Sequence, residues 1–219
     1  DGEIVGLPSD VQMTNIEGKP GADEQTAIDV TLLEGSKIPS FEIVHLELIE
    51  HIASFGKPII LSTGAATYEE IDKAIKIIIS KGNPNIILMA CTLSYHTKDK
   101  DANLRMIQTL KNTYPKIMIG MSDHTLPDKH MAIPAISVAL GARIIEKHFT
   151  MSRKMTGSGH YFSLEPLDVK KMVENIRLFE KVLGNGIIGT AKNEKKAKEG
   201  GRKSIVAKSI IRKGKILSR

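Results

Sequence analysis

Short apolar runs that end in polar residues alternate along this chain with longer amphipathic segments. The runs cover residues 35–42, 57–64, 85–92, 117–125 and 143–150, and each has the composition of a strand that is buried on both faces. Segments of helical length separate them. A regular succession of buried strands and amphipathic helices is typical of a parallel α/β fold. We therefore expect the five strands to lie side by side in one parallel sheet.

The predicted helices carry recognisable start and stop signals. Thr67 and Glu70 have the spacing of a capping box, and Gly82 ends the helix that they begin. Further helices are expected over residues 102–112, 127–142 and 165–183, the last with an apolar face of Val169, Met172, Val173, Ile176, Phe179 and Leu183. A closed (β/α)₈ barrel needs eight strands and typically about 250 residues. The pattern therefore predicts either an open sheet or an incomplete barrel.

The two ends of the chain differ from its middle. Residues 1–34 are rich in Gly, Pro, Asp and Glu without a sustained period, and we expect an irregular lead-in there. The α/β units occupy residues 35–184. A Gly- and Lys-rich linker is expected over 185–203, and residues 204–207 have the composition of a strand that begins a second unit.

The net charge of +6 is unevenly distributed along the chain. Residues 185–219 carry eleven Lys and Arg against two Glu, a net of +9, whereas residues 1–36 carry eight acids and one Lys, a net of −7. The basic segment has almost no aromatic residues, which argues against stacking on bases and so against a nucleic-acid partner. No apolar run reaches the roughly 18 residues of a membrane span.

Two further features bear on the compartment. The first residues lack the basic and apolar regions of a signal peptide. The single cysteine, Cys91, excludes an internal disulfide. Both observations favour a cytoplasmic protein.

Two histidines follow the last two predicted strands and form a candidate metal site. Parallel strands joined by a helix bring their carboxyl ends to one rim, so His124 and His148 are expected close together. Imidazole is a common ligand for Mn, Zn or Fe. Glu146 points to the same side of its strand as His148 and is a candidate direct or indirect ligand. The alternative interpretation is a pair of histidines that only cap the strand ends.

Hydroxyl groups and one lysine gather at the same predicted rim. A lysine with several hydroxyls suits a phosphate or carboxylate, although each serine alone is more often a turn residue. This candidate anion site contains Lys37, Ser40, Ser62, Thr63 and Ser122. Tyr95 and His96, just past the third strand, are candidates to line a pocket, although loop residues often have this composition. Gly157-Ser158-Gly159-His160 would suit either a segment that closes over a ligand or a plain turn. Cys91 lacks the partners of a nucleophile, which favours a buried structural thiol, and no phosphate-binding loop or dinucleotide motif occurs.

A series of motifs carries a resemblance to a known family. In order, they are Lys37-Ile-Pro-Ser-Phe-Glu42, Lys57-Pro-Ile-Ile-Leu-Ser-Thr-Gly64, Cys91-Thr92, Asp101-Ala-Asn-Leu104, Gly120-Met-Ser-Asp-His-Thr125, Ile145-Glu-Lys-His-Phe-Thr150 and Phe162-Ser-Leu-Glu-Pro166. Together they resemble the sialic acid synthase family, which includes N-acetylneuraminate, legionaminate and pseudaminate synthases. The resemblance runs from residue 35 to the end of the chain.

The resemblance implies a fold and a reaction. It implies a (β/α)₈ barrel, here of about five βα units, followed by the beginning of an antifreeze-like domain over residues 204–219. Such enzymes condense phosphoenolpyruvate with an open-chain N-acetylamino sugar of the N-acetylmannosamine type and release phosphate. At full length they form homodimers.

The resemblance also implies roles for particular residues. His124 and His148 would hold a divalent ion, Mn²⁺ first and Mg²⁺ or Co²⁺ as alternatives. The positions implied for phosphoenolpyruvate are Lys37, Ser40, Ser62 and Ser122, with Thr63 and His160 as further substrate-binding positions. Glu42 and Tyr95 match positions of the catalytic pocket.

This chain departs from the family pattern at several points. Ala90 stands before Cys91 where relatives often have histidine, His96 follows Tyr95 in place of proline, and Gly159 precedes His160 in place of aspartate. Residues 1–36 offer no match for the first three strands, and an arginine that the antifreeze-like domain contributes is absent. Two alternatives therefore stand beside the enzyme: a metal-binding fragment without turnover, and a different metal-dependent barrel enzyme such as an aldolase or isomerase.

Overall fold

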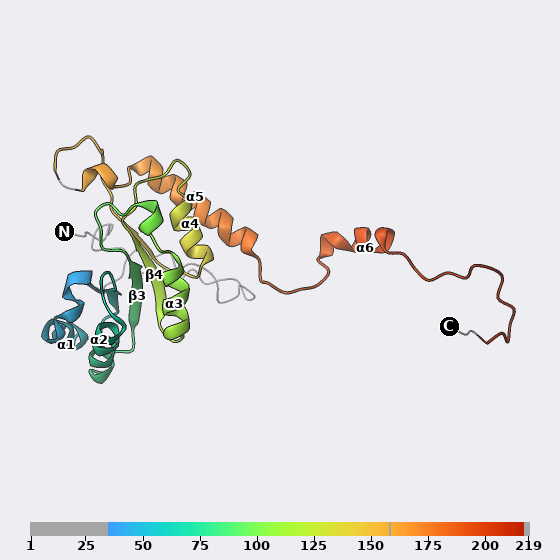
Figure 1. The fold of residues 1–219 in the computed structure, drawn as a ribbon, viewed down its shortest axis with the longest axis horizontal. Coiled ribbons are helices and arrows are strands. Elements are labelled where there is room, and N and C mark those ends of the chain that lie inside the picture. Colours follow the sequence, from blue (N-terminus) through green and yellow to red (C-terminus); the bar gives the residue numbers. More distant parts are fainter. Residues whose placement is uncertain (1–34, 158, 217–219) are drawn as a thin grey trace. The chain divides into compact units, whose positions relative to one another are not determined.

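The computed structural model describes residues 35–157 and 159–216. The chain divides into two compact units, residues 1–184 and 185–219. The first unit holds five parallel strands that pair in chain order (Figure 1): β1 Ser36–Ile38, β2 Ile59–Ser62, β3 Ile86–Cys91, β4 Met118–Asp123 and β5 Ile145–Lys147. This confirms the parallel α/β prediction. The strands curl into part of a barrel, which is the incomplete-barrel alternative.

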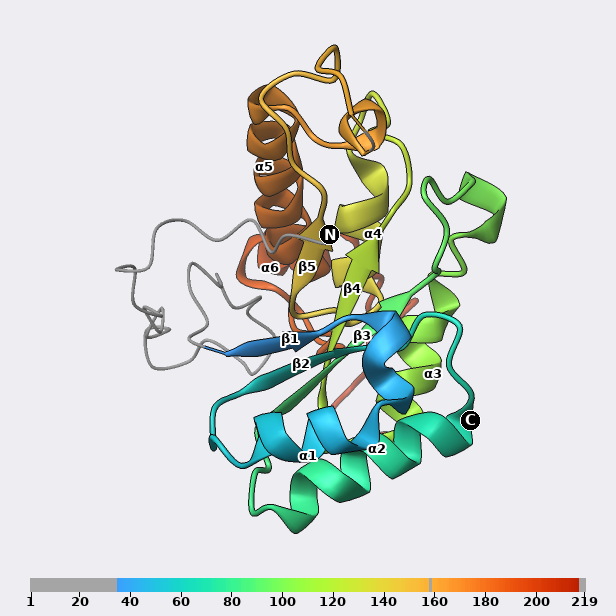
Figure 2. The same ribbon diagram turned by 90° about the vertical axis from the view of Figure 1, so that its left-hand side faces the viewer.

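Each strand presents alternate side chains to two different surroundings. One set packs against the helices α1 Leu46–Ala53, α2 Tyr68–Ser80 and α3 Arg105–Thr113, which lie along one side of the sheet in Figure 2. This main core includes Ile38, Ile59, Leu61, Ile86, Leu88, Ala90, Ile119 and Met121 from the strands. The side chains between them in sequence form the other face, which we call the inner face.

The inner face changes from apolar to polar along the strand direction. A small apolar cluster of Ile60, Ile87, Met89 and Ile144, with Met118 beside it, forms its first part. Ser62, Cys91, Ser122 and Glu146 follow on the same face, toward the carboxyl ends of their strands. The apolar part stabilises the curl of the sheet, and the polar part lies where parallel α/β proteins bind ligands.

The first predicted strand is too long, because β1 ends at Ile38 and not at residue 42. Pro39 has no N–H to donate to a neighbouring strand, and the chain turns into a 3₁₀ helix, η1 Ser40–Val44. The Glu42 N–H donates to the Pro39 carbonyl at 3.0 Å, which closes this turn. Ser40 and Glu42 therefore lie on a helical turn beyond the sheet.

The helix predicted over residues 127–142 is also shorter, since α4 spans only Ala132–Ala139. The Asp128 carboxylate accepts from the N–H groups of His130, at 2.7 Å, and Ala132, at 2.9 Å. Met131 adopts a left-handed backbone conformation with φ of 48° immediately before the helix. The side-chain bonds of Asp128 thus hold a non-helical approach that hydrophobic periodicity does not reveal.

The other helix signals correspond to the structure. In α2, the Thr67 N–H donates to Glu70 at 2.7 Å and the Glu70 N–H donates to Thr67 Oγ1 at 3.3 Å, so the predicted capping box is confirmed. The last helix of the first unit, α5 Pro166–Leu183, packs on α4 through Ile176, Met172 and Phe179. Val173 and Leu183 were predicted to face inward, but they are exposed. The eight-residue α4 is too short to cover all of the eighteen-residue α5.

An arginine fastens the loop before α5 to the start of that helix. The Arg153 guanidinium forms ion pairs with Glu165, at 3.1 Å, and with Asp168. Its backbone N–H also donates to Glu165 Oε1 at 2.8 Å. Glu165 and Asp168 form the capping box of α5. The connection from β5 to α5, which includes the 3₁₀ helix η3 His160–Phe162, is thereby held at its far end.

The second unit contains two short helical segments, η4 Lys192–Glu194 and α6 Lys195–Gly201, inside the predicted linker. The strand predicted over residues 204–207 does not form: these residues have no regular secondary structure. The β-branched composition of Ile205 and Val206 favours a strand, but a strand needs a hydrogen-bonded neighbour. Both side chains are exposed. None of the helices in the described part of the chain is both long and apolar enough to cross a membrane.

Gly120 in β4 is expected to be required for close packing of the sheet. A Cβ atom at this position would lie 2.9 Å from the Ile144 carbonyl oxygen and would overlap the Met89 side chain. We predict that Gly120→Ala lowers the free energy of unfolding by about 1–3 kcal/mol, measured by urea denaturation. Gly189→Ala is the control because its Cβ would meet nothing within 4 Å. Equal stability of the two variants would contradict this account of the inner face.

The Asp168 carboxylate is expected to make stability depend on pH. Burial opposes its ionisation, but the bonds from the Glu165 N–H and the Arg153 guanidinium outweigh burial, so the pKa of Asp168 is lowered from 3.8. A carboxylate with a lowered folded-state pKa stabilises the fold fully above its ordinary pKa, and this contribution disappears as the pH falls through the folded value.

We predict that Asp168→Asn loses about 1 kcal/mol of unfolding free energy near pH 7 and that the loss shrinks as the pH falls through the lowered folded-state pKa of Asp168. Urea denaturation across this range measures both quantities. Glu174→Gln on the same helix is the matched control, because its ion pair with Lys170 is exposed. A loss at Asp168→Asn that is independent of pH would refute the electrostatic explanation.

Candidate metal and anion site

The two candidate metal ligands lie next to each other at the carboxyl ends of β4 and β5. β4 ends at Asp123 and β5 at Lys147, and these two residues are register partners. His124 and His148 follow directly, and their ring centroids are 5.3 Å apart with an angle of 53° between the planes. The structure therefore brings together the two imidazoles that the sequence pattern places at one rim.

The surroundings of His124 determine which ring nitrogen is available. Its Nδ1 lies 3.2 Å from the Thr92 carbonyl oxygen, which can only accept a hydrogen bond. Nδ1 therefore carries the proton, and the lone pair is on Nε2. Such a bond from a ligand's second nitrogen is the usual way in which a protein orients a metal-binding imidazole.

Both imidazoles are held in the neutral form that a metal needs. Burial lowers the pKa of His124. Burial, and then the proximity of His124, lowers the pKa of His148 to about 4. Both rings are thus uncharged at neutral pH, each with one ring nitrogen unprotonated, and no proton has to leave that nitrogen before an ion binds.

The donor set fits an ion that keeps open coordination positions. Among residues 35–157 and 159–216 no group of three or more His, Cys, Asp or Glu is arranged to hold a metal. Within these ranges the candidate ligands are therefore the two imidazoles, which would leave coordination positions for other oxygen or nitrogen atoms. An open coordination sphere is characteristic of catalytic rather than structural sites.

A lysine, a carboxylate and a serine adjoin the histidines on the inner face. Glu146 Oε1 lies 3.2 Å from Lys37 Nζ and accepts from Ser122 Oγ at 2.8 Å. The Lys37 and Glu146 side chains are 13% and 17% exposed. Glu146 thus binds Lys37 across the curl of the sheet, whereas its sequence neighbour Lys147 binds Asp123 on the other face. Lys37 and Ser122 are brought together as the anion-site prediction requires.

Ser62 stands out within this group of polar residues. Its hydroxyl is the one buried side-chain nitrogen or oxygen without a hydrogen-bond partner in the described ranges, and the residue is 1% exposed. An unbonded buried hydroxyl costs free energy. Ser62 lies on the same face as the other candidate residues, so an oxygen of a bound ligand is one partner that would complete its hydroxyl.

The hydroxyls of Ser40 and Thr63 already have partners. Ser40 Oγ accepts from the Gly64 N–H at 3.1 Å and lies 3.7 Å from Cys91 Sγ as a donor. Thr63 Oγ1 donates to the Met89 carbonyl at 3.0 Å. Both residues connect neighbouring strand ends, which is a structural task. Cys91 is buried and burial raises the pKa of its thiol, as expected for a structural cysteine.

The remaining predicted residues lie at different places around the histidines. The Tyr95 ring packs on His124, with centroids 4.6 Å apart, and on His148, at 5.7 Å, while half of the residue stays exposed. Burial raises the pKa of its phenol. Glu42 lies on η1, where its carboxylate meets His45 at 3.1 Å. His160, on η3, bonds Thr150 at 2.8 Å. Among Tyr95, Glu42 and His160, the ring contacts and hydrogen bonds of the described residues connect only Tyr95 to His124 and His148.

Two aromatic residues of η3 belong to the site although residue-by-residue reasoning did not select them. The Phe162 ring lies 4.8 Å from that of His148. Tyr161 donates its hydroxyl hydrogen to the Tyr95 carbonyl at 3.2 Å. η3 therefore covers one side of the histidine pair and holds the segment that carries Tyr95. Phe162 is the first residue of a quoted motif, whereas nothing in the sequence pattern marks Tyr161.

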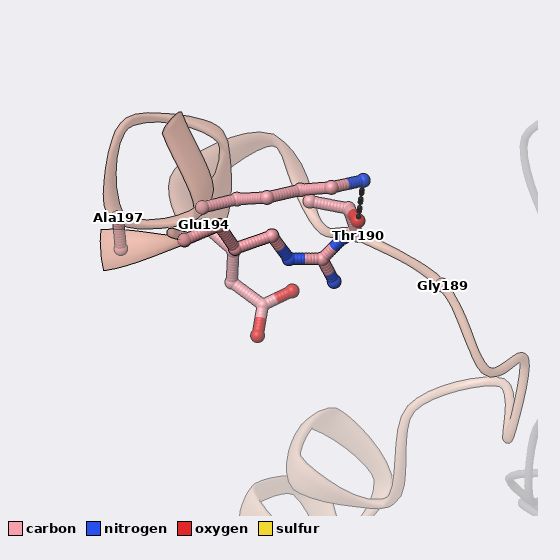
Figure 3. Close-up of a pocket in the computed structure, with 6 residues that line it drawn as sticks. Gly189, Thr190, Glu194 and Ala197 are labelled. Atoms are coloured by element: carbon pink, nitrogen blue, oxygen red, sulfur yellow. Dashed lines mark hydrogen bonds between the residues drawn. The ribbon is translucent and has the colours of Figure 1, made fainter. Parts of the chain in front are cut away.

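A separate hollow lies in the second unit (Figure 3). It has a volume of about 310 Å³ and is lined by Gly189, Thr190, Glu194, Ala197, Lys198 and Arg202. The Lys198 ammonium donates to Thr190 Oγ1 at 3.0 Å across it. Its lining residues are all exposed and include none of the candidate site residues. We therefore base the functional argument on the inner face of the sheet.

Comparisons with known proteins agree with the resemblance in the motifs. An uncharacterised protein of Methanocaldococcus jannaschii is 45% identical over 182 residues, which are 83% of this chain and 53% of that protein. An N,N'-diacetyllegionaminic acid synthase of Campylobacter jejuni is 42% identical and covers 83% of this chain and 54% of the relative.

A solved structure shows the same arrangement. The crystal structure of an N-acetylneuraminic acid synthetase from Leptospira borgpetersenii, in complex with citrate, superposes with a TM-score of 0.68 at 40% identity. It covers 75% of this chain and 56% of the other. The chain thus spans about half the length of the relatives that it matches.

The family model gives the extent of the relationship. The NeuB family model matches residues 23–188, so the match begins before residue 35, where the quoted motifs begin, and ends before the segment 204–219. The match includes all five strands and every residue of the candidate site. This chain belongs to the NeuB family.

Proposed function

We propose that this chain carries the metal-binding part of the active site of a phosphoenolpyruvate-dependent synthase. The substrates would be phosphoenolpyruvate and an N-acetylamino sugar of the N-acetylmannosamine type, and the product a nonulosonic acid of the sialic acid kind. The observation that carries the proposal is the juxtaposition on one face of two neutral imidazoles, a lysine and a buried serine hydroxyl without a partner.

His124 and His148 would hold the divalent ion, with Mn²⁺ as the first candidate and Mg²⁺ or Co²⁺ as alternatives. When bound, such an ion supplies Lewis-acid polarisation of the sugar aldehyde. The protein contributes two ligands whose protonation state needs no adjustment, one of them oriented by the Thr92 carbonyl. Tyr95 and Phe162 pack against the rings and exclude water from one side of them.

Lys37, Ser62 and Ser122 would bind the anionic groups of phosphoenolpyruvate. In the protein without ligand, the Lys37 ammonium is paired with Glu146. An incoming phosphate or carboxylate would share or replace that carboxylate and would give Ser62 its missing partner. Ser40 and Thr63 would shape this site through their bonds to neighbouring strand ends, and Glu42 and His160 are proposed to face the sugar.

The proposed reaction balances without a further reagent. C3 of phosphoenolpyruvate forms a bond to the aldehyde carbon, and C2 becomes electron-deficient. Water adds at C2, and one of its protons goes to the former aldehyde oxygen. The C2–O bond to the phosphoryl group then breaks, inorganic phosphate leaves with that oxygen, and the remaining proton of the water is lost as the C2 carbonyl forms. The strand ends hold the two substrates so that C3 meets the aldehyde, which is a proximity effect.

A second candidate function is supported by the length relationship. The chain covers about half of its relatives, so the part described here would bind metal without turnover if the rest of the barrel is needed for the sugar. Legionaminate and pseudaminate synthesis are variants of the first proposal that differ in the acceptor sugar. The homodimer of the family is part of the same proposal.

Removal of either histidine is expected to abolish metal binding and catalysis together. We predict that His124→Ala weakens Mn²⁺ binding, measured by titration calorimetry, and reduces phosphate release from phosphoenolpyruvate and N-acetylmannosamine by at least about 100-fold. His51→Ala is the control, because His51 lies on α1 and contacts Phe55.

Both measurements are made with this chain and with the longest protein that its gene encodes. Metal binding by the chain without phosphate release, together with release by the longer protein, would support the non-catalytic fragment for this chain alone. If the longer protein released no phosphate with any N-acetylhexosamine across Mn²⁺, Mg²⁺ and Co²⁺, the synthase proposal would be wrong.

Replacement of Ser62 separates its binding role from a structural one. Because the Ser62 hydroxyl has no partner, Ser62→Ala should leave the urea midpoint unchanged or raise it. The same variant should weaken phosphoenolpyruvate binding by about tenfold, the value of one hydrogen bond to a charged group. Thr63→Val is the matched comparison, since it removes a hydroxyl that bonds Met89 and should lower stability. A Ser62→Ala protein with full affinity for phosphoenolpyruvate would refute the assignment.

A further inference from the structure

A buried ion pair lies behind the two histidines, and the proposed reaction does not use it. Lys147 Nζ lies 2.8 Å from Asp123 Oδ2, and the two side chains are 4% and 0% exposed. The two residues are direct register partners at the ends of β4 and β5. Each immediately precedes one of the histidines. Because side chains alternate along a strand, the ion pair and the imidazoles lie on opposite faces of the same two strand ends.

The ion pair also holds the backbone that follows His124. Lys147 Nζ donates to the Thr125 carbonyl at 2.7 Å, and the Thr125 N–H donates to Asp123 Oδ1 at 2.8 Å. His124 lies between Asp123 and Thr125 in sequence, so both of its neighbours take part in these bonds. Its own carbonyl accepts from the Thr97 N–H at 2.9 Å. These bonds fix the His124 backbone relative to β5 on one side and relative to Thr97 on the other.

The corresponding bonds at His148 complete the frame. The His148 carbonyl accepts from the Leu164 N–H at 2.8 Å, and the Thr150 N–H donates to the Leu164 carbonyl at 2.8 Å. The backbone after His148 is therefore bound to the segment that follows η3. The backbone ladder between β4 and β5 stops at Asp123 and Lys147, and the Ser122–Glu146 hydrogen bond joins the two strands on the inner face. The Asp123–Lys147 ion pair is the corresponding side-chain link on the opposite face.

A gain in folding stability does not by itself explain why this ion pair is buried here. Burial of two charges carries a large desolvation cost, and apolar replacements of buried ion pairs are often equally stable or more stable. The ion pair joins the two strand ends from which the His124 and His148 imidazoles extend. Outer partners that orient metal ligands typically affect metal affinity by about 10- to 100-fold.

We propose that Asp123 and Lys147 are positioning residues that fix the separation and orientation of the His124 and His148 rings from the opposite face of the sheet. This inference rests on the metal role proposed above for the histidines. It extends that role to two residues that would contact neither metal nor substrate. Their task is to keep two strand ends, and so two ligands, in one relative arrangement.

The test compares the wild-type chain with a variant that removes both charges, Asp123→Asn with Lys147→Met. The single Lys147→Met variant would leave Asp123 buried and unpaired and would lose stability for that reason alone. In the double variant, asparagine keeps an acceptor for the Thr125 N–H while the link between the strands is lost. Ile78→Ala is the control for stability, because Ile78 is fully buried in the main core. Lys81→Met is the control for loss of a lysine, because its ion pair with Glu50 is exposed.

Three quantities are measured for each protein: the urea midpoint, the Mn²⁺ dissociation constant and the visible absorption spectrum with Co²⁺. We expect the double variant to unfold near the wild-type midpoint, to bind Mn²⁺ about 10- to 100-fold more weakly and to show shifted Co²⁺ bands. Ile78→Ala should lose stability and keep both metal properties, and Lys81→Met should keep all three. A double variant with wild-type Mn²⁺ affinity and an unchanged Co²⁺ spectrum would overturn the inference.

A readout without metal distinguishes this inference from the proposed function. Imidazole nitrogen resonances of the metal-free wild type should show His124 as a single Nδ1–H tautomer, and those of the double variant should show averaging between tautomers. A wild type that binds neither Mn²⁺ nor Co²⁺ would refute the metal role, whereas identical imidazole spectra in both proteins would refute the positioning role.

Discussion

The alternation of side chains along five parallel strands is the constraint on which the whole first unit depends. All strands run in one direction, so their last residues meet at one rim, and each strand contributes to two faces in turn. One face is occupied by the isoleucine-rich core beneath α1, α2 and α3. The other carries the candidate metal and anion site. A shift of β4 by one residue would exchange its two faces, since it would place His124 under the helices and Asp123 on the inner face.

The charged residues of the unit follow from the same constraint. Lys37 and Glu146 compensate each other on the inner face, and Asp123 and Lys147 compensate each other behind it. The sheet thus carries one ion pair on each side: the inner pair joins β1 to β5, and the outer pair joins β4 to β5. The inner pair is partly exposed, whereas the outer pair is buried.

Much of the fold could be predicted from hydrophobic pattern, because buried parallel strands and amphipathic helices have distinct periods. The failures occur where local bonds override the pattern. Pro39 ends β1 early, Asp128 and Met131 delay α4, and residues 204–207 have strand composition without a strand to pair with. These errors lie at element ends, where one side-chain bond decides the outcome.

The site was predictable to a lesser degree. The proximity of His124 and His148 follows from the order of the elements alone, and so does that of Lys37 and Ser122 to one face. The partner of each hydroxyl does not, because Ser40, Ser62 and Thr63 look alike in sequence and differ only in what lies within reach. The Asp123–Lys147 pair has a signal in the sequence, which is two opposite charges directly before two histidines in neighbouring strands. Its interpretation requires the register of β4 against β5.

The loop between β5 and α5 is bonded to its surroundings at several points, among them the His160–Thr150 hydrogen bond. Arg153 binds it to the start of α5, and Tyr161 binds it to the backbone of Tyr95. The stretch between these anchors contains Gly157 and Gly159, both with positive φ. Substitutions in that stretch would change one side of the candidate site and leave the strands unchanged. This loop is therefore the part of the described structure in which the surroundings of His148 can vary while the sheet stays the same.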